Sequence, residues 1–186
     1  MIDRRNVNVA VVLCIGIAVA FVTGAARAQD GEPEKAPIAT VTAGWTYLWA
    51  DQGAGERSNL NGWFARPAVT IGRGYSGFAD FTNYYGSNHK GRVNSHGFTF
   101  GVSKDIFTQP RFKPAIFAEV GDVRSSNAGV IVNQFAFATA ASFSIPLQRW
   151  VSLAITPAEY IFLYPKGDVR NDFNSKVGFS FPIGHR

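Results

Sequence analysis

The sequence predicts an all-β protein: an eight-stranded antiparallel up-and-down transmembrane β-barrel, preceded by a cleavable signal peptide. Three observations predict it. Large apolar side chains alternate with small or polar ones along eight segments, and a period of two is typical of β-strands. The apolar face is aromatic in most segments, whereas the opposite face carries mainly Gly, Ala, Ser and Thr. The chain also begins with a basic, then an apolar, then a small-residue stretch.

The first 28 residues have the layout of a secretory signal peptide. Two arginines precede an apolar run from Val9 to Val22, and a small-x-small site, Ala-Arg-Ala, ends at Ala28. The run is shorter than the ~20 residues that a spanning helix needs. This favours cleavage after Ala28 over an N-terminal membrane anchor.

Cysteine and charge exclude several kinds of site from the remaining chain. Cys14 is the only cysteine and lies within the signal peptide, so we expect no disulfide, thiol nucleophile or Cys-based zinc site after cleavage. The leader also carries much of the basic excess, and without it the net charge falls from +5 to about +3, which gives little support to nucleic-acid binding. We expect a signal peptide over 1–28, a polar linker over 29–37 and one barrel domain over 38–186.

Eight β-type segments follow the linker, and no stretch shows a helical period. The larger residues of one face are, in order, Val41, Trp45 and Trp49 in 38–50; Trp63, Val69 and Ile71 in 60–71; Ala79, Phe81 and Tyr85 in 77–85; Phe98, Phe100 and Val102 in 95–104; Ile116, Ala118 and Val120 in 112–124; Phe135, Phe137 and Phe143 in 135–144; Leu153, Tyr160 and Phe162 in 150–164; and Phe173, Phe179 and Phe181 in the last. The breaks between them are DQGAGERSN, GRGYS, GSNHKGRVN, DIFTQPR, RSSNAGVIV, PLQR and PKGDVRND.

The stretch FAFATAASFS, residues 135–144, indicates which face meets which environment. Phe135, Phe137 and Phe143 share one face, and most of the other face is Ala and Ser. A soluble sheet would bury the rings and expose a polar face, whereas a membrane barrel turns apolar residues to lipid and small or polar ones to its lumen. Because eight strands leave an interior only wide enough for side chains, small residues are expected on the inner face.

Closure and segment length also fit a membrane barrel. An open sheet edge in hydrocarbon would leave N–H and C=O groups unpaired, at several kcal/mol each. Most segments are about nine to thirteen residues long, which matches a tilted span. The tryptophans and tyrosines near segment ends are expected in aromatic girdles; they are Trp45, Trp49, Trp63, Tyr84, Tyr85, Trp150, Tyr160 and Tyr164.

Two prolines fall inside predicted strands, where each removes a ladder hydrogen bond. At Pro157 the alternation also changes parity, because Leu153 and Ile155 face one way and Tyr160 and Phe162 continue one residue out of step. This pattern predicts a β-bulge at Pro157. No such shift accompanies Pro67.

The chain after the linker resembles the small outer-membrane β-barrel proteins of the OmpA type. The resemblance rests on residues 61–86 (NGWFARPAVTIGRGYSGFADFTNYYG), residues 135–146 (FAFATAASFSIP) and the last strand. In that strand Lys176, Gly178, Phe181 and Ile183 look like the signal that the barrel-insertion machinery reads, although the chain continues to Arg186 rather than ending on an aromatic residue.

The resemblance implies a non-enzymatic, monomeric outer-membrane protein with a structural, membrane-integrity or surface-interaction role. It implies a periplasmic N-terminus and linker, four outer loops, contact with outer-membrane lipid and lipopolysaccharide, and neither a cofactor nor a nucleic-acid partner. Two alternatives remain at this point: an outer-membrane lipid-modifying enzyme of the lipid A deacylase or acyltransferase type, and a secreted soluble lipocalin-like binding barrel with its rings inside.

Five charged residues fall on the small face and are expected in the lumen: Arg66, Asp80, Glu119, Glu159 and Lys176. Two cations and three carboxylates in a narrow interior must pair, because an unpaired buried charge is expensive. The pattern therefore predicts an ion-pair network that plugs the barrel. A conducting path or a catalytic carboxylate pair is the alternative reading of the same residues.

Histidines near the second outer loop are the other candidates for chemistry. His89 and His96 have serines nearby, but no third residue that would orient a catalytic base can be named from the sequence, and no spacing resembles a metal site. We therefore predict no catalytic, cofactor or metal residues. Instead, His89, Lys90 and Arg92 could contact lipopolysaccharide phosphates, or could simply form a solvated loop.

Overall fold

The computed structural model describes residues 37–53, 55–88, 91–107, 112–127, 129–164 and 169–185. The predicted signal peptide, and the linker up to residue 36, lie outside the described residues. Within the described part of the chain, no helix is long and apolar enough to span a membrane.

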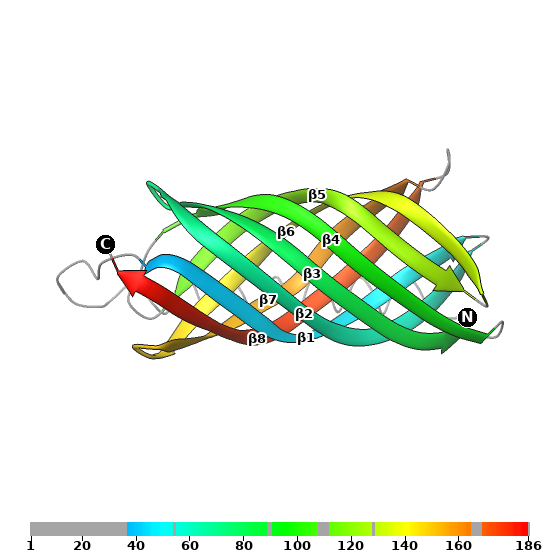
Figure 1. The fold of residues 1–186 in the computed structure, drawn as a ribbon, viewed down its shortest axis with the longest axis horizontal. Helices are drawn as coiled ribbons and strands as arrows, with labels where there is room; N and C mark the ends of the chain where they lie inside the picture. Colours follow the sequence, from blue (N-terminus) through cyan, green and yellow to red (C-terminus); the bar gives the residue numbers. More distant parts are fainter. Residues whose placement is uncertain are drawn as a thin grey trace, which may run out of the picture. The chain divides into compact units, whose positions relative to one another are not determined.

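Eight antiparallel strands form a closed barrel in simple up-and-down order, as predicted (Figure 1). They are β1 (Pro37–Gly53), β2 (Glu56–Gly72), β3 (Tyr75–Asn88), β4 (Gly91–Asp105), β5 (Lys113–Asn127), β6 (Val130–Gln148), β7 (Val151–Tyr164) and β8 (Arg170–His185). Each strand pairs with the next, and β1 pairs with β8 to close the ring. Figure 1 shows the strands running obliquely around the barrel, with the start of β1 and the end of β8 at one end.

The seam between β1 and β8 depends on two glycines. Gly44 and Gly178 are register partners, and a Cβ added at Gly44 would lie 2.1 Å from the Val177 carbonyl oxygen and 2.3 Å from the Gly178 Cα. The two backbones therefore approach more closely than any side chain at this position would allow, and the close approach explains why glycine stands on both strands.

The strands are longer than the alternation predicted, at 14 to 19 residues. β1 continues to Gly53 and β2 begins at Glu56, so most of the expected loop DQGAGERSN belongs to the sheet. Gly53 and Gly55 have φ values of 82° and 80°, which suits a tight hairpin because glycine has no Cβ. The sequence-based boundaries were too short because a change to polar residues marks the end of the apolar band, whereas strand pairing continues beyond it.

The alternation in FAFATAASFS places the rings outside, as predicted. Phe135 and Phe137 are 58% and 38% exposed, while Ala136 and Ala138 are 1% and 2% exposed. The same division holds around the barrel, since far more of the large apolar side chains are exposed than buried. The soluble lipocalin-like alternative requires these rings in the interior, and they lie on the outer surface.

One predicted girdle residue is an exception. Tyr84 points into the barrel and is 3% exposed, whereas its neighbour Tyr85 is 47% exposed. Tyr84 shares the inward parity of Asp80, four residues earlier on β3, so position near a strand end was a poor guide to its face. It belongs to an apolar cluster in the lumen, which we call the apolar layer: Leu48, Ala50, Leu60, Tyr84 and Val93.

The bulge predicted at Pro157 is present. Thr156 pairs with Lys176 and Glu159 with Asn174, so β7 uses one residue more than β8 between these two pairs. Thr156 and Glu159 both point inward, at 5% and 1% exposure, which an unbroken alternation would not allow because their positions have opposite parity.

Pro67 does not lie in a bulge. Pairing of β2 with β3 holds at Ala65–Phe81 and resumes in the same register at Ala68–Phe78. Pro67 points outward and is exposed. The missing amide donor therefore interrupts the ladder locally and does not shift it.

Candidate functional site: the charged layer inside the barrel

The structure brings together all five charged residues that the sequence placed in the lumen. Five different strands supply them: β2, β3, β5, β7 and β8 contribute Arg66, Asp80, Glu119, Glu159 and Lys176. Each has the inward parity of its strand, and the four residues other than Arg66 are between 1% and 4% exposed. We call this group the charged layer.

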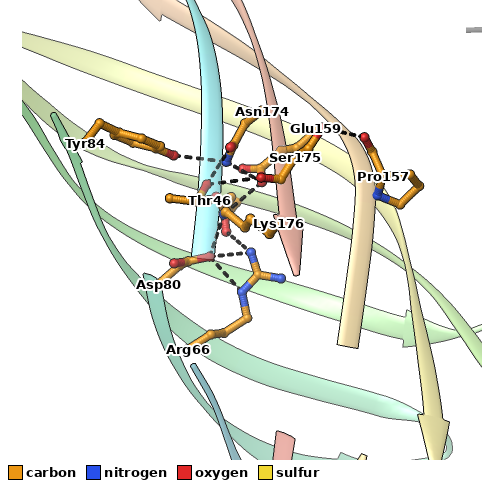
Figure 2. A network of polar contacts seen from close by, with 10 residues as sticks. Thr46, Arg66, Asp80, Tyr84, Pro157, Glu159, Asn174, Ser175 and Lys176 are labelled. Atoms are coloured by element: carbon orange, nitrogen blue, oxygen red, sulfur yellow. Dashed lines mark hydrogen bonds and ion pairs between the residues drawn. The ribbon is translucent and has the colours of Figure 1, made fainter. Parts of the chain in front are cut away.

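Asp80 is the centre of the charged layer, between two cations (Figure 2). Its Oδ2 accepts hydrogen bonds from Arg66 Nε at 2.8 Å and Lys176 Nζ at 2.8 Å, and Arg66 Nη2 contacts the same oxygen. Lys176 Nζ also lies 2.8 Å from Glu159 Oε2. Glu119 has the longest contact, at 3.4 Å from its Oε2 to Arg66 Nη2.

Three uncharged residues complete the hydrogen bonding on the Lys176 side. Thr46 Oγ1 donates to Asn174 Oδ1 at 2.6 Å. Asn174 Nδ2 lies 3.0 Å from the Tyr84 hydroxyl oxygen and 3.2 Å from Glu159 Oε2, and donates to both (Figure 2). Sequence reasoning missed this role. Asn174, two residues from Lys176 on β8, could have been found from parity alone.

Aromatic rings fill the lumen beside the cations. The Arg66 guanidinium carbon lies 4.5 Å from the centre of the Phe78 ring and 4.3 Å from that of Phe117, and the two rings meet edge to face. Lys176 Nζ is 5.8 Å from the Phe64 ring centre. Such cation–π contacts are favourable where water is excluded. These inward phenylalanines were not singled out, because most rings in the sequence face outward.

Little space remains next to the charged layer. The cavity bordered by Glu119, Glu159 and Lys176 has a volume of about 30 Å³, which is room for about two water molecules. The apolar layer borders the same cavity through Leu48 and Tyr84. The lumen is thus filled by charged pairs and, beside them, by packed apolar side chains.

The carboxylates of the charged layer are engaged in ion pairs. The carboxylates of Asp80, Glu119 and Glu159 each contact a cation, and the described residues include no group of three or more His, Cys, Asp or Glu side chains that could hold a metal ion.

Among the described candidates, Ser87, Ser95 and His96 do not form a nucleophile–base pair. Ser95 is buried in the lumen, hydrogen-bonded to Ser125 at 3.0 Å, while His96 is exposed on the outer wall. Ser87 pairs with Arg92, and His96 lies four residues further along β4, about 13 Å away at the rise of an extended strand.

The remaining predicted residues are placed as follows. His89 and Lys90 lie outside the described residues, and Arg92 is exposed near the start of β4. Among the residues of the proposed insertion signal, Lys176 points inward, while Phe181 and Ile183 are 40% and 53% exposed on the outer wall of β8.

The chain matches no protein-family model and no curated protein, but its fold matches solved structures. Neisserial surface protein A aligns with a TM-score of 0.65 and 14% identity, over 78% of this chain and 97% of the other. The N-terminal β-barrel domain of Pseudomonas aeruginosa OprF aligns with a TM-score of 0.51 and 11% identity, over 78% and 98%. The attachment invasion locus protein Ail of Yersinia pestis gives 0.50 and 11%, over 78% and 99%. The chain therefore has the fold of the eight-stranded outer-membrane β-barrels.

Proposed function

We propose that this chain is a non-enzymatic protein of the bacterial outer membrane whose barrel is closed by its own side chains, with a structural or surface-contact role. The observation that carries the proposal is the charged layer, where five strands place paired charges across the lumen. A pore would need a wide, hydrated path, and a lipid-modifying enzyme would need an assembled nucleophile and base. Among the described residues, the charged layer leaves no wide hydrated path and contains no assembled nucleophile and base.

The outward aromatic face supports the outer-membrane location. In this location the N-terminus is periplasmic, and the hairpins β1–β2, β3–β4, β5–β6 and β7–β8 face the exterior. The insertion machinery would read Lys176, Gly178, Phe181 and Ile183 in β8. Cell fractionation tests the location, together with the gel mobility of unheated and heated samples, since a folded barrel migrates differently from the unfolded chain. Recovery in the soluble fraction, with one mobility, would refute the location.

Conductance in planar bilayers tests the closed lumen. Arg66→Ala removes two ion pairs but leaves the apolar layer in place, so we expect a lower unfolding temperature without a rise in conductance. Leu60 is 1% exposed in the apolar layer, and Leu60→Ala alone leaves the charged layer intact. Only the double variant Leu60→Ala/Arg66→Ala should conduct ions. A large conductance in the wild type or in Arg66→Ala would contradict a purely structural lumen.

We also propose that the β3–β4 hairpin contacts lipopolysaccharide phosphates through His89, Lys90 and Arg92. The support is the sequence, in which three residues that are cationic or can become so occur within four positions. Replacing all three with neutral polar residues should reduce the lipopolysaccharide that co-purifies with the folded barrel. An unchanged amount would rule out the contact.

A further inference from the structure

We propose that the outer wall of β3, β4 and β5 binds the phosphorylated sugar headgroup of an outer-leaflet lipid. The site consists of four polar side chains, Asn83, His96, Asp122 and Arg124, which we call the polar notch. The proposal rests on the outer-membrane location proposed above, and it concerns residues on the barrel wall, separate from the β3–β4 hairpin.

The polar notch lies on three strands that are side by side in the barrel (Figure 1). Asn83 on β3 pairs with His96 on β4, and His96 pairs with Arg124 on β5. Asp122 lies two residues from Arg124 and pairs with Phe98. All four have the outward parity of their strands, and His96, Asp122 and Arg124 are exposed.

On β2, β7 and β8 the outer wall is aromatic at the same level. The residues three positions towards the loop ends from Arg66, Glu159 and Lys176 are Trp63, Phe162 and Phe173, which are 49%, 40% and 40% exposed. On β3 and β5, the residues three positions towards the loop ends from Asp80 and Glu119 are the polar residues Asn83 and Asp122. The polar notch therefore interrupts an aromatic band, and polar side chains facing hydrocarbon are unfavourable unless something pairs with them.

Distance along the strand places the notch near the lipid headgroups. Arg124 lies five residues beyond Glu119, which is about 17 Å along the strand, or roughly 13 Å along the barrel axis at a strand tilt of about 40°. Asp122, three residues beyond Glu119, lies roughly 8 Å above the charged layer by the same reasoning. We place the centre of the apolar band at the level of the charged layer, and a band ~25 Å tall then has its upper edge between these two levels.

Within the described part of the chain, the notch side chains are not paired with one another or with other side chains. None of the four makes a side-chain hydrogen bond or ion pair with another described residue, and Asn83 Oδ1 is buried without a hydrogen-bond partner. They border a groove of about 440 Å³, which Trp63, Phe81 and Phe98 also line. The groove thus has apolar rings, which could contact an acyl chain, next to polar groups that lack hydrogen-bond partners among the described residues.

The mixture of charges favours a phosphorylated sugar over a simple phosphate. Arg124, with His96 beside it, offers donors suited to phosphate oxygens. Asp122 would repel an isolated phosphate, but its carboxylate accepts hydrogen bonds from sugar hydroxyls, and the Asn83 amide nitrogen can donate hydrogen bonds to them. A lipid whose headgroup carries both phosphate and hydroxyl groups on a sugar satisfies all four side chains.

Lipid retention on the purified full-length barrel tests the proposal. The wild type in detergent is incubated with bisphosphorylated lipid A, dephosphorylated lipid A or phosphatidylglycerol, and bound lipid is counted by native mass spectrometry. The double variant His96→Asn/Arg124→Gln should retain about tenfold less bisphosphorylated lipid A, because hydrogen bonds to a charged group are lost. Arg149→Gln is the matched control: the same change of charge at an exposed position in the β6–β7 turn, at the opposite end of the barrel, should have no effect.

Asp122→Ala separates the sugar from the phosphate. It should weaken retention of lipid A and leave unchanged, or strengthen, that of phosphatidylglycerol, because it removes a carboxylate. Equal retention of lipid A by the wild type and the double variant would overturn the proposal. So would retention of the dephosphorylated lipid, or of phosphatidylglycerol, as strong as that of bisphosphorylated lipid A. All variants are first shown to fold by heat-modifiable mobility, so a negative result here is distinct from failure of the outer-membrane assignment.

Discussion

Replacing Lys176 with methionine tests whether the charged layer stabilises the barrel. Lys176 is 3% exposed, and its Nζ lies 2.8 Å from both Asp80 Oδ2 and Glu159 Oε2. Methionine retains most of the side-chain length but not the charge, so one cation, Arg66, would face three carboxylates. Removing one partner of a buried ion pair costs about 3–5 kcal/mol, and we expect the free energy of unfolding to fall by that amount.

Glu119→Gln is the matched control. The wild-type charged layer has three carboxylates and two cations. Among the three carboxylates, Glu119 makes the longest contact with a cation, 3.4 Å to Arg66. Its neutralisation leaves Asp80 and Glu159 paired with Lys176, so the change should be about 1 kcal/mol or less. A second variant, Lys176→Met/Glu159→Gln, removes a cation and a carboxylate together and should recover a substantial part of the loss.

Urea unfolding in phosphatidylcholine vesicles, followed by tryptophan fluorescence, measures all three variants. Refolding from urea bypasses the cellular insertion machinery, so an effect of Lys176 on recognition of β8 does not enter the result. The reasoning is refuted when Lys176→Met loses no more stability than Glu119→Gln, or when Lys176→Met/Glu159→Gln is no more stable than Lys176→Met alone.

Two further predictions concern the backbone. Gly44→Ala should destabilise the folded barrel by about 3 kcal/mol or prevent closure, because the new Cβ would lie 2.1 Å from the Val177 carbonyl oxygen; Gly77→Ala, whose Cβ would meet only Ile71 Cδ1 at 3.5 Å, should fold normally, and equal vesicle refolding yields for the two would contradict the account of the seam. Deleting Pro157 should abolish refolding, because loss of the extra bulge residue turns either Glu159 or the β7 residues before it to the wrong face. Pro157→Ala keeps the residue count and should refold, and a refolding deletion variant would show that the bulge is dispensable.

The composition of the charged layer could be predicted because it needs only two facts: the parity of each strand and closure of the sheet. Arg66 and Lys176 are 110 positions apart in the sequence, yet both carry inward parity, and a narrow lumen leaves no other place for them. The bulge at Pro157 was predictable for the same reason, because a change of parity is visible without knowledge of the partner strand.

The apolar layer and the polar notch could not be found in this way. Leu60 is the first residue of a predicted strand and was not singled out, and Val93 lies in a polar break that was assigned to a loop. Only the continued pairing of β3 and β4 shows that Val93 points into the lumen. Tyr84 and Tyr85 are adjacent tyrosines with opposite roles. Asn83, His96 and Arg124 are polar residues on the outward faces of three different strands, and they form one surface only because the register makes them neighbours.

The sequence by itself determined which face of each strand meets lipid and which meets the lumen, because a side-chain period of two holds in any register. The tertiary structure decided which inward and outward residues touch one another. Asp80 lies between Arg66 and Lys176, and His96 lies beside Arg124, because the strand tilt and the hydrogen-bond register of a closed barrel set the relative heights of strands far apart in the chain. Those heights are a property of the whole ring, and no single segment encodes them.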